Sequence, residues 1–223
     1  MSQSQKKPIL SFDLDGTLMK PGFGDKVWLE GLPEIYAETH NLSLKNAQQE
    51  LLAAYDRIGN TQREWYDLSY WIHKLNLSIT PEELLHKFQQ YITPFEEVPD
   101  LLKRLSKEYD LIISSAAMKP FIIIELKTAK LYDYFTSFFS ATSDTHTVKK
   151  DPYFYQMIIK KLKCDPQDII HVGDNEQFDY FSPIKAGLKA YYLDRSASSS
   201  TNHIITTLEE FEEIIKNDSE KSI

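Results

Sequence analysis

The chain has 223 residues, of which 42% are hydrophobic, and 33 acidic against 25 basic residues give it a formal net charge of -8. This acidic balance argues against a nucleic-acid partner, because nucleic-acid backbones are bound by clustered Lys and Arg. It leaves room for a small phosphorylated substrate, which needs only a local positive site. The single cysteine, Cys164, excludes an intramolecular disulfide.

The start of the chain and its longest apolar runs predict a soluble, cytoplasmic protein without a membrane partner. Residues Met1 to Pro8 are polar and include no apolar stretch of signal-peptide length. Apolar runs such as Phe121 to Ile124 are far too short to span a bilayer. A lone thiol also suits a reducing compartment. The oligomeric state stays open.

Short apolar runs that end in turn residues predict the strands of an α/β fold. Four such runs are Ile9 to Leu14, Leu111 to Ile113, Ile169 to Val172 and Ala190 to Leu193. Between them, Pro99 to Glu108 and Tyr153 to Leu162 repeat apolar residues at helical spacing.

Residues 22–93 differ from the rest, because they show helical periodicity and no convincing strand. The candidate helices are Leu29 to Thr39, Leu44 to Ile58, Arg63 to Leu75 and Pro81 to Tyr91, the last with Thr80 as its N-cap. We therefore predict a helical insert over 22–93 and a core made of 1–21 and 94–223. Glycines at Gly22 and Gly24, and the pair Thr93 and Pro94, are candidate hinges between the two.

The strongest chemical signal is the pair Asp13 and Asp15, followed by Gly16, at the end of the first predicted strand. Side chains alternate along a strand, so the two carboxylates should point the same way. Adjacent carboxylates repel, and a bound divalent cation would relieve that repulsion. Asp13 could then act as a nucleophile and form an aspartyl-phosphate, while Asp15 served as general acid and base.

A second acidic group follows the third predicted strand, where Gly173 and Asp174 are succeeded by Asp179. Magnesium takes octahedral oxygen ligands, usually one or two carboxylates together with substrate oxygens and water. Asp13, Asp174 and the backbone carbonyl of Asp15 would suit this demand. Asp179 could be an indirect, water-mediated partner, or an acid that stabilises a helix N-terminus.

Phosphoryl transfer also needs donors and positive charge around the phosphate oxygens. Ser114 follows the second predicted strand and could supply a hydroxyl, and the backbone N–H of Ser115 could add a donor. Lys149 precedes Asp151 and Pro152 at a predicted helix start and could neutralise both nucleophile and phosphate. Each of these residues also has an ordinary structural explanation, as a strand-ending serine or a solvent-facing lysine.

Together these residues resemble the four motifs of the haloacid dehalogenase-like superfamily, in order and across essentially the whole chain. The matching segments are Asp13-x-Asp15-Gly16-Thr17, Ser114, Lys149, and Gly173-Asp174-x-x-x-x-Asp179. Two positions depart from the family pattern, since Ser115 stands in place of Asn and Lys150 in place of the proline after the lysine. Aligning Asp151 and Pro152 with the family's Asp-Pro favours Lys149 as the catalytic lysine.

The resemblance implies a Rossmann-like parallel-sheet core with the active site at the strand C-termini, which agrees with the rule for open α/β sheets. It also implies an inserted helical cap and a Mg²⁺ cofactor. By this resemblance the phosphate would be bound by Thr17, Ser114, Ser115 and Lys149, and the metal by Asp13, Asp15 and Asp174.

Within this superfamily we expect a phosphatase that acts on a small phosphorylated metabolite. Members that dehalogenate haloacids or cleave phosphonates lack an acid two residues after the nucleophile, so Asp15 argues for phosphate esters. A phosphomutase shares the same motifs and remains an alternative. A dehalogenase, or a binding protein without activity, is a weaker alternative.

The cap is expected to select the substrate. Arg57, Arg63, Trp65 and His73 lie in and around its third predicted helix and could line the substrate pocket. The aromatic residues of this segment could instead pack the cap helices together.

Overall fold

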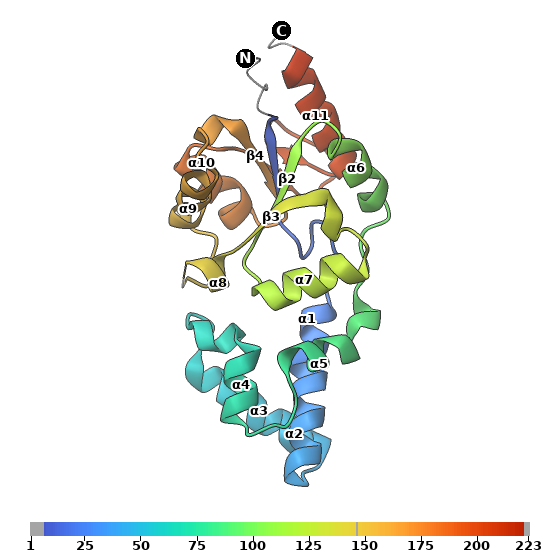
Figure 1. The fold of residues 1–223 in the computed structure, drawn as a ribbon, viewed down its shortest axis with the longest axis vertical. Coiled ribbons are helices and arrows are strands. Elements are labelled where there is room, and N and C mark those ends of the chain that lie inside the picture. The colour runs from blue at the N-terminus through green and yellow to red at the C-terminus, as the bar shows by residue number, and fades with distance from the viewer. Residues whose placement is uncertain (1–6, 146, 221–223) are drawn as a thin grey trace, which may run out of the picture.

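A six-stranded parallel sheet forms the core of the computed structural model, which describes residues 7–145 and 147–220 (Figure 1). Its strands are β1 (Ile9–Phe12), β2 (Asp110–Ser115), β3 (Phe135–Ser140), β4 (Ile169–Gly173), β5 (Lys189–Leu193) and β6 (Ile204–Ile205). They lie in the order β3-β2-β1-β4-β5-β6, and every neighbouring pair is parallel. The predicted α/β class is therefore confirmed, and β1, the strand that precedes Asp13, lies in the middle of the sheet.

Helices cover both faces of this sheet. One face packs against α6 (Val98–Leu105), α7 (Lys119–Thr128) and α11 (Leu208–Glu220), through buried residues such as Leu101, Ile122 and Phe211. The other packs against α9 (Pro152–Leu162), which α10 (Ser182–Ala186) contacts, through residues such as Phe154 and Ile158. A short helix, α8 (Ala141–Asp144), follows β3. Among the helices described, none combines the length and the apolar character needed to cross a membrane.

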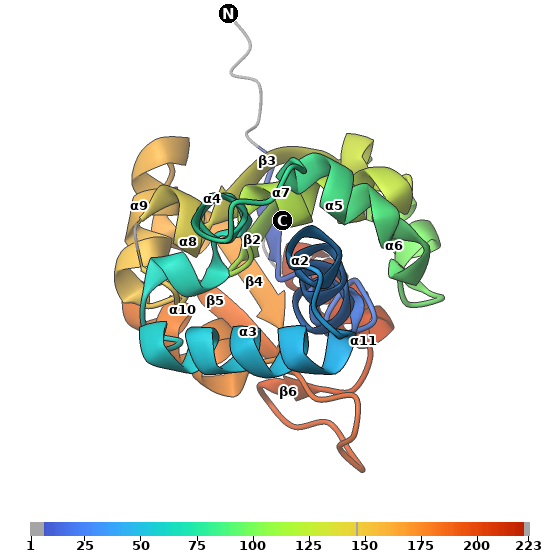
Figure 2. The ribbon, with the colours of Figure 1, turned by 90° about the horizontal axis from the view of Figure 1, so that it is seen from below.

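The segment between β1 and α6 forms a separate layer of helices, which we call the helical cap. Its elements are α1 (Phe23–Lys26), η1 (Val27–Gly31), α2 (Leu32–His40), α3 (Leu44–Ile58), η2 (Arg63–Tyr66), α4 (Leu68–Lys74), α5 (Pro81–Lys87) and η3 (Gln89–Tyr91). They surround their own hydrophobic cluster, centred on the fully buried Trp71. Phe121 and Ile124 of α7 belong to this cluster, so α7 joins the cap to the sheet (Figures 1 and 2).

The local sequence explains where the cap helices begin and end. The predicted helix Leu44 to Ile58 is present in full, and Thr80 caps α5 in a reciprocal capping box with Glu83. The predicted helix Arg63 to Leu75 is instead split at Asp67. The Asp67 carboxylate accepts the backbone N–H of Ser69 at 2.9 Å and thereby starts α4 as a new helix.

Two chain segments connect the core to the cap, and they run side by side. The backbone N–H of Lys20 donates to the carbonyl of Thr93 at 2.8 Å, and that of Phe95 donates to Leu18 at 3.0 Å. Gly22, directly before α1, has φ 126°, which L side chains rarely adopt. The two segments in which we predicted hinges are therefore neighbours in space.

Candidate active site

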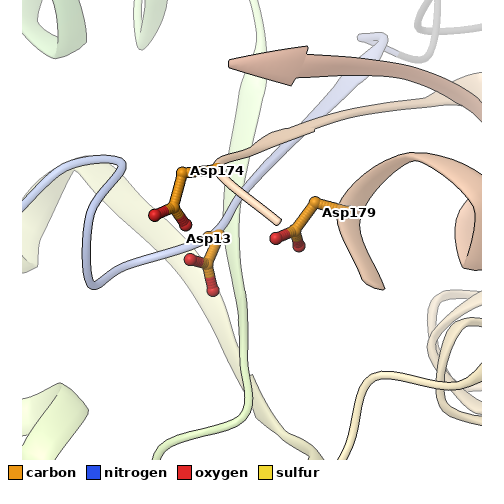
Figure 3. A group of neighbouring side chains, drawn as sticks. All are labelled: Asp13, Asp174 and Asp179. Atoms are coloured by element: carbon orange, nitrogen blue, oxygen red, sulfur yellow. The ribbon is translucent and has the colours of Figure 1, made fainter. Parts of the chain in front are cut away.

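Three carboxylates meet at the C-terminal edge of the sheet. Asp13 follows β1 and Asp174 follows β4, and these strands pair in parallel with Phe12 opposite Val172. Asp179 lies one helical turn further along the chain, in η6 (Glu176–Phe181). One oxygen from each of the three carboxylates lies within 4.8 Å of the other two (Figure 3). This is the edge at which open α/β sheets bind their ligands.

Two glycines make room for this cluster. A Cβ atom on Gly16 would overlap the carboxylate of Asp174, and a Cβ on Gly173 would overlap that of Asp179. Gly16 also has φ 79°, which allows the chain to turn immediately after Asp15. The glycines of the two Asp-Gly and Gly-Asp motifs are thus required by close approach as well as by the turn.

Lys150 is the cation of the cluster. Its buried ammonium contacts Asp13 and lies 2.5 Å from Asp179 Oδ1. Burial alone would lower the pKa of Lys150, but the charges and hydrogen bonds of the two carboxylates outweigh that effect and raise it. Lys150 is therefore held in its charged form beside the nucleophile candidate.

We expected Lys149 beside Asp13, but the structure places Lys150 there. Lys149 is exposed, and its ammonium lies over the ring of Phe178, 5.6 Å from the centroid. Asp151 caps α9 by accepting the backbone N–H of Phe154 at 3.0 Å, and its own backbone N–H donates to the Lys149 carbonyl at 2.9 Å. This bond closes a tight turn around Lys150, and the two adjacent lysines therefore face different surroundings.

Asp15 faces a buried acid that the sequence did not suggest. The carboxyl of Glu125, on α7, hydrogen-bonds to Asp15, and burial together with the charges of Asp15 and Asp13 raises its pKa well above the usual range. Desolvation by the surrounding protein, followed by the charge of Asp13, also raises the pKa of Asp15, to about 6, although this residue is exposed on the side of the cavity. A fraction of the Asp15 carboxyls is therefore protonated near neutral pH. It lies outside the three-carboxylate cluster, where Asp179 takes the third place.

The three clustered carboxylates titrate differently. Burial and the charge of Asp179 raise the pKa of Asp13, with Lys150 opposing. Desolvation, followed by the charges of Asp13 and Asp179, raises the pKa of Asp174 to about 7, although this residue is exposed on one side. Burial would also raise the pKa of Asp179, but Lys150 and the hydrogen bond from His171 lower it to about 2.

This donor set fits a hard divalent cation. All the groups are oxygen donors in a space of ion-binding size, and desolvation together with the charges of neighbouring carboxylates raises the pKa of Asp13 and of Asp174, an effect that a bound cation would oppose. Asp13 and Asp174 are the residues that would hold the ion. Both oxygens of Asp179 are already engaged, Oδ1 by Lys150 and His171 and Oδ2 by the backbone N–H of Asn175, so this residue would lie beside the ion rather than bind it.

A buried network of hydrogen bonds holds the Asp179 carboxylate in position. His171 Nε2 lies 2.8 Å from Asp179 Oδ1 and 3.2 Å from the Tyr155 hydroxyl, and its Nδ1 lies 2.8 Å from Ser11 Oγ. The backbone N–H of Asn175 donates to the other Asp179 oxygen at 3.1 Å. His171 is thus a packed strand residue that orients Asp179.

The predicted phosphate-binding residues lie at the same edge. Thr17 Oγ1 is fully buried and has no hydrogen-bond partner among the described residues. A buried hydroxyl in this state is able to donate to a bound phosphate. Ser114 accepts the hydroxyl of Ser11 at 2.7 Å and keeps its own proton to donate. Ser115 Oγ accepts the backbone N–H of Ala117 at 3.1 Å and so shapes the loop before α7.

A cavity of about 390 Å³ opens from Asp15 into the cap. It is lined by Asp15, Pro21, Gly22, Gly24, Asp25, Trp28, Leu29, Leu52, Tyr55, Asp56, Trp65 and Tyr66. Of the four residues predicted to select the substrate, Trp65 lines this cavity. Arg57, Arg63 and His73 are not among its lining residues in the described part of the chain. The Arg57 Nε bonds instead to the Ala53 carbonyl of its own helix, and His73 is exposed.

The fold is shared with solved structures of several enzymes. A HAD phosphatase from Thermococcus onnurineus is 24% identical and superposes with a TM-score of 0.73 over 94% of this chain and 97% of that one. A magnesium-bound HAD hydrolase from Bacillus subtilis gives 18% identity and a TM-score of 0.64, over 95% and 100% of the two chains. The L-2-haloacid dehalogenase of Xanthobacter autotrophicus gives 16% and 0.59, over 94% and 98%.

Sequence comparison points to the same family. The haloacid dehalogenase-like hydrolase domain-containing protein 3 of Danio rerio is 26% identical over 80 residues, a match that spans a third of each chain. The family model described as haloacid dehalogenase-like hydrolase matches residues 10–193, which include every carboxylate of the cluster. The chain therefore belongs to the haloacid dehalogenase-like hydrolases.

Proposed function

We propose that this hydrolase is a magnesium-dependent phosphatase that cleaves a small phosphate monoester through an aspartyl-phosphate on Asp13. The observation that carries the proposal is the position of Asp15, two residues after the nucleophile candidate at the mouth of the cavity, where its pKa is raised to about 6 and a fraction of the carboxyls is protonated near neutral pH. An alkoxide leaving group needs that proton, whereas a halide does not. Because the structural neighbours include a phosphatase and dehalogenases, the choice between the two chemistries rests on this residue.

The reaction has two steps. In the first, an Asp13 oxygen attacks phosphorus, the bond from phosphorus to the ester oxygen breaks, and Asp15 gives its proton to that departing oxygen. In the second, the Asp15 carboxylate takes a proton from water as the water oxygen attacks phosphorus. The Asp13 carboxylate then leaves with the bond electrons, and inorganic phosphate is released. Asp15 ends the cycle protonated, so acid and base are one residue.

The remaining residues hold the phosphoryl group. Lys150 offers a fixed positive charge at Asp13, and the unpartnered Thr17 hydroxyl offers a donor. Ser114 and the loop after β2 supply further donors. A bound Mg²⁺, held by Asp13 and Asp174, would offset the carboxylate charges and the negative charge of the phosphate.

A phosphomutase remains the second candidate, because the same first step serves both reactions. It differs only in the acceptor of the second step, which would be the product alcohol instead of water.

The test is phosphate release from 4-nitrophenyl phosphate and from a panel of phosphorylated metabolites, with Mg²⁺ and with EDTA. We expect release with Mg²⁺ and none with EDTA. Release of halide from 2-chloropropionate, with no phosphate from any ester, would establish dehalogenation instead. Isomerised sugar phosphate without free phosphate would establish a mutase.

A further inference from the structure

We infer that the organic part of the substrate is apolar, carries no negative charge, and is recognised best when it bears a cationic head such as a quaternary or protonated amine. This inference rests on the proposed function, because it concerns the group esterified to the phosphate that Asp13 would attack. It comes from the walls of the cavity that opens beside Asp15.

Aromatic rings form one wall of this cavity. The ring centroids of Trp28 and Trp65 lie 6.4 Å apart, those of Trp28 and Tyr55 6.1 Å, and those of Trp65 and Tyr66 4.6 Å. Phe121 stacks behind Trp28 at 6.1 Å and thereby fixes its orientation. A group of aromatic residues around one cavity is an arrangement that attracts quaternary ammonium groups, through the negative faces of the rings.

The hydroxyl groups of this wall are already committed. The Tyr55 hydroxyl donates to the Trp28 carbonyl at 3.1 Å, and the Tyr66 hydroxyl donates to the Asn60 carbonyl at 3.1 Å. Neither proton is therefore available to a carboxylate or a second phosphate of a ligand. What these tyrosines offer to the cavity is ring surface.

The charged residues of the lining have one sign. Asp25 and Asp56 are exposed at the wall, and no Lys, Arg or His is among the described lining residues. The nearby Lys26 is paired with Glu30 at 2.6 Å. An ester with a carboxylate or a second phosphate would face these acids with no partner, whereas a cation would be attracted by the acids and by the rings.

Leu29 and Leu52 complete the lining, and both are unusually exposed for large apolar side chains, at 45% and 49%. A bound organic group would remove part of this surface from water, which favours binding of an apolar body. The wall of the cavity therefore selects the organic group of the substrate by its shape and its charge. The phosphate group binds at the C-terminal edge of the sheet, where the carboxylates lie.

Three phosphate monoesters of nearly equal shape test the inference. They are choline phosphate, the uncharged 3,3-dimethylbutyl phosphate, and the phosphate ester of 4-hydroxy-2,2-dimethylbutanoate, which carries a carboxylate in place of one methyl group. We expect kcat/KM to fall in that order, by roughly 10-fold between the cation and its uncharged counterpart. The baseline is 4-nitrophenyl phosphate, an ester with a good leaving group and no charged head, which reports whether the chemistry at Asp13 proceeds.

Variants separate recognition from the different reactivity of the three alcohols. In Asp25→Asn and Asp56→Asn the ratio of kcat/KM for the cation to that for the uncharged ester should shrink. In Glu38→Gln, which removes an exposed cap acid outside the cavity, the ratio should stay as in the wild type.

Two outcomes would overturn the inference. One is an anionic ester that is hydrolysed as well as, or better than, the cationic ester while 4-nitrophenyl phosphate is turned over. The other is a cation preference that Asp25→Asn and Asp56→Asn leave unchanged. Failure to release phosphate from every ester, 4-nitrophenyl phosphate included, would instead refute the phosphatase itself and the inference with it.

Discussion

The ammonium of Lys150 lies 2.5 Å from a carboxylate oxygen of Asp179, and this pair holds the positive charge in contact with Asp13. Lys150→Ala should lower kcat/KM for phosphate esters by roughly 10²–10³-fold, as for the loss of one fixed electrostatic group. Lys149→Ala, the matched control on the adjacent exposed residue, should change it little. Because the first variant leaves buried carboxylates without a cation, rates are compared per folded molecule, judged by circular dichroism. Equal losses in both variants would contradict the assignment of Lys150.

Asp15 gives a prediction that depends on the leaving group. Asp15→Asn removes the proton donor, so hydrolysis of alkyl phosphates should slow by ~10²–10⁴-fold. Formation of the aspartyl-phosphate from 4-nitrophenyl phosphate should suffer less, since nitrophenolate leaves without a proton. The measurement is single-turnover release of each alcohol, and Asp13→Asn is the control that should abolish release from both. The same penalty on both esters would mean that Asp15 is not the acid.

Glu125 should act through its proton. Its raised pKa keeps it protonated, and as a hydrogen-bond donor it limits the rise in the pKa of Asp15. Glu125→Gln keeps a donor, so the pH dependence of kcat/KM on an alkyl phosphate should stay close to that of the wild type. Glu125→Leu removes the donor, and the limb that reports Asp15 should move to higher pH. Matching profiles in the two variants would show that the hydrogen bond has no such effect.

The stability of the metal-free protein should fall as pH rises from about 4 to about 7. Asp15 and Asp174 have folded-state pKa values of about 6 and about 7, above the ordinary value of 3.8, so the folded state binds more protons in this window. Their contribution is present below the unfolded pKa and is lost as pH passes the folded pKa. Asp179, with a pKa of about 2, loses its contribution only in stronger acid.

Thermal unfolding in EDTA and in Mg²⁺ at pH 5 and pH 8 checks this. Tm in EDTA should be lower at pH 8, and Mg²⁺ should raise it more at pH 8 than at pH 5, because the ion binds ionised carboxylates. Asp174→Asn should flatten both effects. A Tm in EDTA that rises between pH 5 and pH 8 would refute the prediction.

Gly173→Ala should damage the site by displacing the neighbouring side chain of Asp179. The added methyl group would overlap Asp179 and push it away from Lys150, at a cost of about 1–3 kcal/mol in the free energy of unfolding. Both Tm and kcat should fall. Gly24→Ala is the stability control, because its methyl group meets open space in a helix, and Tm should hold or rise. A Gly173→Ala variant with unchanged Tm and kcat would contradict the required close approach.

The sequence was sufficient to predict those features that depend on residues close together in the chain. Four strands, the α3 boundaries and the Thr80 cap follow from short-range patterns and were predicted. Strands β3 and β6 were not. The sequence of β3, Phe-Thr-Ser-Phe-Phe-Ser, is neither a continuous apolar run nor a regular alternation, and this strand lies at the sheet edge, where burial is incomplete. Strand β6 is only two residues long. The placement of Asp13 and Asp174 together followed from one rule, that parallel strands end at the same edge.

What the sequence could not supply depends on contacts between distant segments. Glu125 stands in an apolar stretch of α7 and gives no local sign that it meets Asp15. The choice between Lys149 and Lys150 depends on how the chain turns before α9, and a motif with the proline replaced does not encode that. Trp65 lines the cavity, as predicted, whereas Arg57 bonds to a carbonyl of its own helix and is not among the lining residues.

The side-by-side connections of the cap have a consequence for how such proteins can diversify. Lys20 and Thr93 are joined by a backbone hydrogen bond, so the whole cap leaves and re-enters the core across a gap no wider than that between neighbouring strands, about 4.8 Å. A segment of almost any length can close so short a gap at little extra entropic cost, because closure entropy grows only slowly with length. Helical caps of different length and sequence can therefore be inserted at this one point of the core without moving β1 or the carboxylates that follow it.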